Sequence, residues 1–298
     1  MDTANELKLH GEGLALAQHS GIRWFLRMLF RKRSAQIGGA VVAFLVFFAI
    51  FGPRVVPYDP FDVQTEVRLT PPGLEHPFGT DELGRDLFSR ILYGSRYTVL
   101  IGLIAVSISS LGGLLMGLPT AYWGSWADML IMRIADIMLS FPYILLVLAI
   151  VAMLGPSLTN AMIAIGVAGM PSYARLVRGC VLSAKEEEYV VASQSIGSKD
   201  FRIMFRTILP NIMSPIIVYL TLDLPTAVLS AAALSFLGLG AQPPLPEWGA
   251  LMVNARTFIG SAPWVVTAPG LAIFVSILGL NIFGNALRDT LDPWQRER

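Results

Sequence analysis

Long apolar runs alternate with short polar segments along almost the whole chain. A helix needs about 20 residues to cross the hydrocarbon core of a membrane. The run 137–174 is too long for one span, and Gly155-Pro156-Ser157 divides it in two. The pattern therefore predicts an all-α polytopic membrane protein with six transmembrane helices, at 35–52, within 97–127, on either side of Gly155 in 137–174, at 211–237 and within 257–287.

Composition agrees with a membrane protein. Of 298 residues, 54% are hydrophobic and only 14% are charged, whereas soluble domains carry about 25% charged residues. A net charge of +1 leaves no electrostatic footprint for nucleic acid. The lone cysteine, Cys180, excludes an internal disulfide framework and a cysteine-based metal cluster.

Basic residues set the expected orientation. Lys and Arg flank the first apolar run, and they recur in the loop 175–206, so both regions are expected in the cytoplasm. The first run lacks a cleavage signature and is followed by further spans, which favours a transmembrane helix over a signal peptide. The predicted organisation is a cytoplasmic tail with an interfacial helix (1–34), a first span (35–52), an extracytoplasmic segment (53–96), a core with five spans and a cytoplasmic loop at 179–210 (97–287), and a cytoplasmic tail (288–298).

The charged segment 186–210 predicts two short helices joined at Gly197. Glycine takes the left-handed conformation that ends a helix. Ser198 is placed to cap the second helix, and Asp200 would lie in its positive first turn. An ordered polar helix pair between membrane spans indicates a docking element rather than a plain connector.

The small pair Ala192-Ser193, then Gly197, then Ile208-Leu209-Pro210 resembles the EAA loop of ABC-importer permeases. The resemblance implies a fold like that of type I ABC-importer permeases, in which this loop contacts an ATPase subunit. Val191 stands where the family usually has Glu, although acidic residues occupy 186–188. The residues expected to couple to the ATPase are Glu188, Ala192, Ser193, Gly197, Ser198, Asp200, Leu209 and Pro210.

Three further segments, Phe78–Asp86, Ser235–Gly249 and Leu287–Pro293, resemble the dipeptide/oligopeptide/nickel branch of these permeases. The resemblance implies import of di- or oligopeptides, or of glutathione and similar solutes, across a bacterial inner membrane by alternating access. It also implies a second homologous permease, two ATP-binding subunits that hold ATP and Mg, and an extracytoplasmic substrate-binding protein. The expected further contacts of this chain are membrane lipid and no nucleic acid, and it would bind no cofactor itself.

Four charged residues lie close together in the extracytoplasmic segment: Asp81, Arg85, Asp86 and Arg90. They could pair with one another on a short helix. Alternatively, they could contact an extracytoplasmic partner, and the sequence leaves both interpretations open.

Asp223 is expected well inside the fifth span, ~18 Å along the helix from Asn211. An intramembrane carboxylate is costly and normally faces a partner or a water-filled path. The hypothesis is that Asp223 lines the translocation path and meets the amino group of a substrate; the alternative is burial against a partner subunit. Asp136 and Asn281 are further candidates for the path, although Asp136 could instead pair with Arg133.

Catalytic signatures are missing from the sequence. It contains no GxxxxGK[ST], HExxH or GxSxG motif, and its histidines are scattered, so the chain is not expected to be an enzyme. A channel or secondary transporter would normally show two related halves, and none is visible. A membrane scaffold would not explain the helix pair at 186–210.

Overall fold

The computed structural model describes residues 22–291, and every regular secondary-structure element within them is a helix. The prediction of an all-α fold is therefore confirmed. The α-helices are α2 (Ile22–Arg31), α3 (Arg33–Val55), α4 (Leu87–Trp123), α5 (Ser125–Ser140), α6 (Tyr143–Leu154), α7 (Leu158–Lys185), α8 (Glu188–Ser195), α9 (Asp200–Arg202), α10 (Leu209–Phe236), α11 (Trp248–Ala255) and α12 (Trp264–Leu291). Short 3-10 turns cover Thr65–Val67 and Arg256–Phe258, and a π-helical segment, η2, covers Ile203–Ile208.

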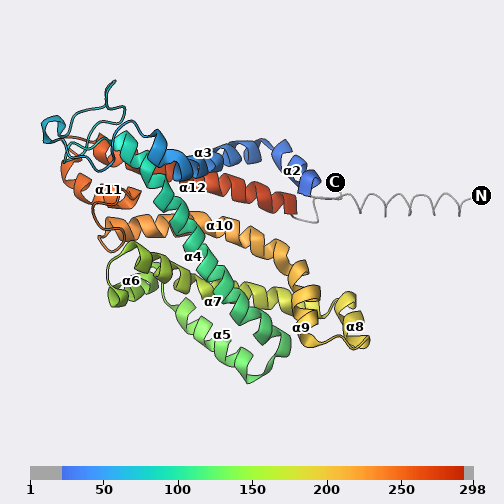
Figure 1. The fold of residues 1–298 in the computed structure, drawn as a ribbon. Helices are drawn as coiled ribbons and strands as arrows, with labels where there is room; N and C mark the ends of the chain where they lie inside the picture. Colours follow the sequence, from blue (N-terminus) through green and yellow to red (C-terminus); the bar gives the residue numbers. More distant parts are fainter. Residues whose placement is uncertain (1–21, 292–298) are drawn as a thin grey trace, which may run out of the picture.

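The long helices lie side by side and α4 crosses the others (Figure 1). At one end of the molecule, α8 and α9 project beyond the long helices, on the same side as α2. The loop 56–86 and α11 lie at the opposite end. The molecule therefore has two structured polar ends separated by the apolar helices.

Four helical bodies are long and apolar enough to cross a membrane: α3, α4, Asp200–Phe236 and α12. The pair α5 and α6 gives a fifth if it is counted as one span, although the two helices are bent by 98°. By the same criterion α7 is not a candidate, although it has 28 residues. Length and composition thus support four or five spans where the sequence predicted six.

Several helices extend beyond the apolar runs that predicted them. The helix that holds the second predicted span begins at Leu87, because the carboxylate of Asp86 accepts a hydrogen bond from the Ser89 amide at 2.7 Å and caps it. The segment between α3 and α4 therefore covers 56–86, which lies inside the predicted extracytoplasmic segment 53–96. Residues 128–136 belong to helix α5. The last long helix begins at Trp264, within the predicted run 257–287, and continues to Leu291.

The structure shows a full break between two helices at Pro142. Helix α5 ends at Ser140, and Pro142 precedes the first residue of α6. Proline disfavours helical geometry in the residue before it, which explains why the chain leaves the helix at Phe141. The observed 98° bend is far larger than a kink within one continuous helix.

Close contact between α4 and α7 organises the centre of the fold. A Cβ atom added to Gly113 would lie 2.3 Å from the Cβ of Tyr173, and one added to Gly117 would lie 2.6 Å from the Ala174 carbonyl oxygen. Neither position can hold a larger side chain without moving the helices apart. Gly113 and Gly117 therefore form a small-residue packing motif between the two helices.

Candidate functional site

The turn at Gly197 ends α8 with a defined hydrogen-bond pattern. Gly197 has φ +76°, its amide donates to the Gln194 carbonyl at 2.9 Å, and the Ser198 amide donates to the Ser193 carbonyl at 3.2 Å. These two bonds form a Schellman motif. Ser198 thus completes the end of α8; the prediction that it caps the second helix was wrong, since Lys199 occupies that position without a side-chain bond.

The second helix of the loop does not end before the next span. Helix α9 passes through η2 into α10, so Asp200–Phe236 forms one helical body of 37 residues. Pro210 has no amide hydrogen, and the π-type bond from the Leu209 amide to the Met204 carbonyl lies just before it. Helices α9 and α10 are therefore parts of one continuous helical body.

Buried side chains fasten the loop to the long helices. Val190 of α8 is fully buried. It belongs to an apolar cluster that also contains residues of η2, α4, α7 and α10. The buried members contributed by the loop are Val190, Ile203, Met204 and Ile208. Burial of side chains of this size stabilises by about 1.5–3 kcal/mol each, so the loop is held as an ordered element.

A polar clamp joins the loop to the end of α4. The carboxylate of Asp200 accepts hydrogen bonds from the Tyr122 hydroxyl at 3.0 Å and from the Trp123 indole at 3.2 Å. The Lys185 ammonium donates to the Tyr122 carbonyl at 2.7 Å and lies 5.5 Å from the centre of the Tyr122 ring. Asp200 was predicted in the first turn of its helix, which is confirmed; its partners on α4 could not be predicted from the sequence.

The outward side of the loop carries exposed apolar side chains. Ile196 is 82% exposed and Phe201 is 70% exposed. Val191, at the position where the family usually has Glu, is also exposed. Glu188 and Ala192 are exposed beside them and Ser193 is half-buried. A polar segment that buries one apolar side and exposes another has the form of a docking surface.

The structure places Asp223 in a cluster of tyrosines between α7 and α10. The Tyr173 hydroxyl donates to the Asp223 carboxylate at 3.2 Å. The ring of Tyr219 packs edge-on against the Tyr173 ring, with centroids 4.7 Å apart. Asp223 is partly rather than fully buried. Tyr173 is 50 residues away in sequence, so only the packing of α7 on α10 reveals this partner.

The other two candidates for the translocation path, Asp136 and Asn281, form no hydrogen bond or ion pair with Asp223 in the described structure. Asp136 forms an exposed ion pair with Arg175 at 2.7 Å, so the predicted pairing with Arg133 was wrong. A second pair links the same two helices, because Arg178 binds Asp128 through two nitrogens at 2.8 Å. Asn281 lies on α12, one turn from Gly284, where α12 packs against α10.

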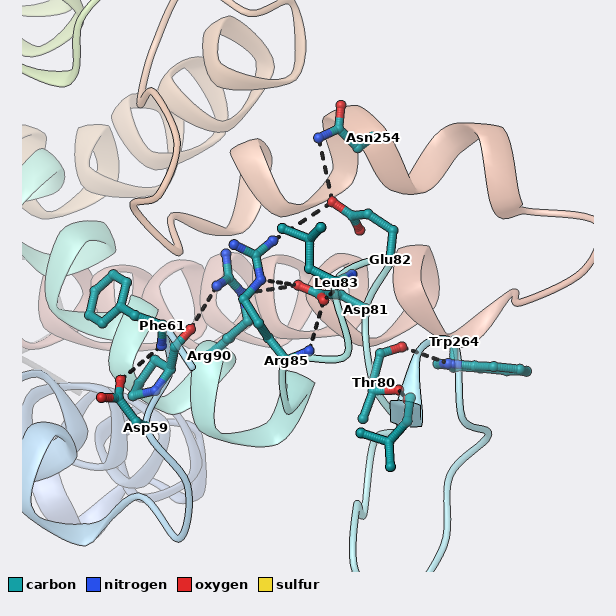
Figure 2. A network of polar contacts seen from close by, with 12 residues as sticks. Asp59, Phe61, Thr80, Asp81, Glu82, Leu83, Arg85, Arg90, Asn254 and Trp264 are labelled. Carbon is teal, nitrogen blue, oxygen red and sulfur yellow. Dashed lines mark hydrogen bonds and ion pairs between the residues drawn. The ribbon is translucent and has the colours of Figure 1, made fainter. Parts of the chain in front are cut away.

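At the opposite end of the molecule, Asp81 is the centre of a polar network (Figure 2). Its carboxylate accepts from Arg85 at 2.7 Å and lies 3.6 Å from Nε of Arg90. Arg90 also donates to the Pro60 carbonyl at 2.7 Å. The expected mutual pairing is therefore confirmed for these three residues. They lie in a turn and at the start of α4, so the predicted short helix was wrong.

Most of these charged residues are buried and do not form an exposed binding surface. Asp81, Asp86 and Arg90 are each 3% exposed. Asp86 lies 2.9 Å from the buried ring of His76 and caps α4. These contacts fasten the loop 56–86 to α4, which is a structural role within the chain.

Comparison with protein families identifies the chain. The family described as the binding-protein-dependent transport system inner membrane component matches residues 109–297, and the N-terminal transmembrane domain of oligopeptide transport permease C matches residues 22–72. The chain belongs to this permease family. The first match contains both the loop 186–210 and Asp223.

Relatives of this permease have named substrates. A dipeptide transport system permease protein of Alkalihalophilus pseudofirmus is 48% identical over 267 residues, covering 90% of this chain and 88% of the relative. A di/tripeptide permease protein of Pseudomonas aeruginosa is 46% identical and covers 94% of both chains. A glutathione permease protein of Pectobacterium atrosepticum is 42% identical, covering 91% and 90%.

One solved structure supports the fold of the permease. A chain of the MetNI methionine ABC transporter, in an inward-facing conformation, matches with a TM-score of 0.53 at 18% identity. The match covers 68% of this permease and 96% of the other chain. At this identity the likeness concerns the fold alone.

Proposed function

We propose that this permease imports small peptides as one subunit of an ATP-binding-cassette transporter. Support comes from three relatives above 40% identity, whose names specify dipeptides, di/tripeptides and glutathione. All three are short peptides with free charged groups. The substrate class of this chain is therefore short peptides, with glutathione among them.

The observation that carries the mechanism is the two-sided loop 186–210. One side is packed into the long helices through Val190 and η2, whereas the other exposes Ile196 and Phe201. We propose that this exposed side docks on an ATP-binding subunit. ATP-driven movement of that subunit would then displace α10 through the continuous helix and α4 through Asp200. The permease itself is not the ATPase.

We also propose the other subunits of the transporter. A second homologous permease would complete the pore, two ATP-binding subunits would dock at the end that carries α8, and a substrate-binding protein would deliver peptide at the end that carries α11. Counting α7 and the bent pair of α5 and α6 as spans gives six, with both termini in the cytoplasm of a bacterium. The exposed basic side chains of α2 favour that side for the N-terminus.

Docking can be tested by changing the charge of the exposed apolar side chains. The permease would be expressed with its operon neighbours and purified through a tag, as wild type and as Ile196→Asp and Phe201→Asp. Burying an unpaired carboxylate in an interface is costly, so ATP-binding subunits should co-purify with wild type and be lost from both variants. Leu74→Asp is the matched control, because Leu74 is fully exposed at the other end of the molecule. Equal recovery of these subunits with all four proteins would contradict the proposal.

We propose that Asp223 lines the translocation path and binds the ammonium group of a passing peptide, with Tyr173 orienting its carboxylate. Support comes from its incomplete burial and from the absence of a basic partner within residues 22–291. Asp223→Asn should reduce peptide uptake while complex assembly stays normal. Asp62→Asn, which changes an exposed carboxylate in the loop 56–86, is the control. Unchanged uptake of every peptide by Asp223→Asn would remove this residue from the path.

A further inference from the structure

Arg96 is a cation on a candidate membrane-spanning helix. Gly52, near the end of α3, packs against Leu92 of α4: a Cβ atom added there would lie 3.1 Å from the Leu92 carbonyl oxygen. Leu92 therefore marks the level at which the apolar run 35–52 ends. Arg96 is one turn further along α4, ~6 Å toward the middle of the membrane. The charge thus lies near the membrane interface and just inside it.

The surroundings of Arg96 contain aromatic rings and no counter-charge. Its guanidinium carbon lies 5.3 Å from the centre of the Tyr93 ring and 5.6 Å from that of Tyr97. One nitrogen donates to the Tyr93 hydroxyl at 3.2 Å. Within residues 22–291 no carboxylate is close enough to form an ion pair with it. A guanidinium has five N–H donors, so most of them remain for a ligand.

An apolar stripe continues from Arg96 along the same side of α4. Leu100, Leu103 and Ile104 follow at intervals of four, seven and eight residues, which places them on one helix face. They are 42%, 54% and 38% exposed. The buried side of the helix at this level faces α10, because a Cβ atom on Gly102 would contact Leu224 at 3.3 Å. Arg96 and its stripe therefore point away from the cluster around Asp223.

We propose that Arg96 binds the phosphate of a membrane phospholipid whose acyl chain lies along Leu100, Leu103 and Ile104. A cation above a lengthwise apolar surface matches the charge and shape of a phospholipid. Tyr93 and Tyr97 lie at the level where amphipathic rings favour the headgroup region. Arginine gives a phosphate several charge-assisted hydrogen bonds from a planar fork. The proposal concerns lipid alone and does not depend on the transported substrate.

Native mass spectrometry of the purified chain can test this lipid proposal directly, with two lipids that have the same acyl chains. Dioleoyl phosphatidylglycerol carries the phosphate, and dioleoylglycerol lacks it. Wild type should retain the phospholipid at least about tenfold more strongly, as expected for charge-assisted hydrogen bonds. Arg96→Gln should remove that preference, and Arg96→Lys should restore part of it. Arg68→Gln is the matched control, because Arg68 also lies over an aromatic ring, Phe258, but outside the long helices.

Three results would overturn the proposal. Equal retention of dioleoylglycerol and dioleoyl phosphatidylglycerol by wild type would show that no phosphate is recognised, and this comparison needs no variant. Displacement of the phospholipid by a dipeptide, with Arg96→Gln raising the KM for uptake, would instead assign Arg96 to a substrate carboxylate. An unchanged phospholipid preference in Arg96→Gln would also contradict the role of this side chain.

Discussion

Replacing Tyr122 with phenylalanine tests how the loop 186–210 acts on α4. The substitution removes the hydroxyl that donates to Asp200 at 3.0 Å and keeps the ring. Tyr122 is 7% exposed, so the ring stays packed. The ring also continues to face the Lys185 ammonium. The variant should therefore fold normally and weaken only the connection between α9 and α4.

The size of the effect follows from the two bonds that Asp200 accepts. A hydrogen bond to a charged group contributes about 1.5–3 kcal/mol when it is shielded. Asp200 is exposed to solvent, so a value below this range, about 1 kcal/mol, is expected for Tyr122→Phe, which corresponds to about a fivefold change in the attached population. Asp200→Ala also removes the bond from Trp123, and about 2 kcal/mol is expected for the pair.

The assay compares peptide uptake with ATP hydrolysis by the assembled transporter in lipid vesicles. Tyr122→Phe should lower the number of peptides carried per ATP while ATP hydrolysis continues. The double variant with Asp200→Ala should be no worse than Asp200→Ala alone, because both changes act on one bond. Tyr58→Phe is the control, since Tyr58 lies in the loop at the other end of the molecule. An uptake per ATP equal to that of wild type in Tyr122→Phe, or fully additive losses, would refute the clamp.

Two further predictions concern stability. Gly113→Val should lower the melting temperature, with a loss of about 3 kcal/mol, because its Cβ would lie 2.3 Å from that of Tyr173; Gly179→Ala, with nothing within 4 Å, should leave it unchanged or higher. Burial raises the pKa of Glu247, outside the long helices, although its carboxylate accepts from the Ala250 amide at 2.9 Å. A raised folded-state pKa contributes stability at low pH that is lost as the pH rises above about 4.5. Glu247→Gln keeps the hydrogen-bond acceptor but cannot ionise. As the pH rises, the melting temperature of this variant should therefore increase relative to that of wild type. A constant difference between the two melting temperatures across pH would exclude ionisation of Glu247.

Local signals in the sequence predicted the local features correctly. Gly197 does end α8 in the left-handed conformation, because glycine alone takes it without strain. Gly155-Pro156-Ser157 does separate α6 from α7. Both features depend on the backbone preferences of one to three residues, which are visible in the sequence.

Contacts between distant residues were not predictable in this way. The partners of Asp200, Asp223 and Asp128 lie 50 to 78 residues away along the chain. Each depends on how helices that are distant in sequence pack, namely α4 on α9, α7 on α10 and α5 on α7, and many positions would satisfy the same pairing rule. The pairing expected for Asp136 failed for the same reason, because Arg175 on α7 is closer than its neighbour Arg133. The charged loop residues near Asp81 paired as expected because they are close in sequence.

ATP-dependent uptake of a dipeptide into vesicles tests the central claim most directly. The assembled transporter would be compared as wild type, Gly197→Pro and Gly197→Asn. Proline cannot adopt the φ of +76° found at Gly197, whereas asparagine tolerates it. The account predicts ATP-dependent uptake by wild type and Gly197→Asn, and its loss in Gly197→Pro. Uptake by the purified chain alone without ATP, or unchanged uptake by Gly197→Pro, would contradict it.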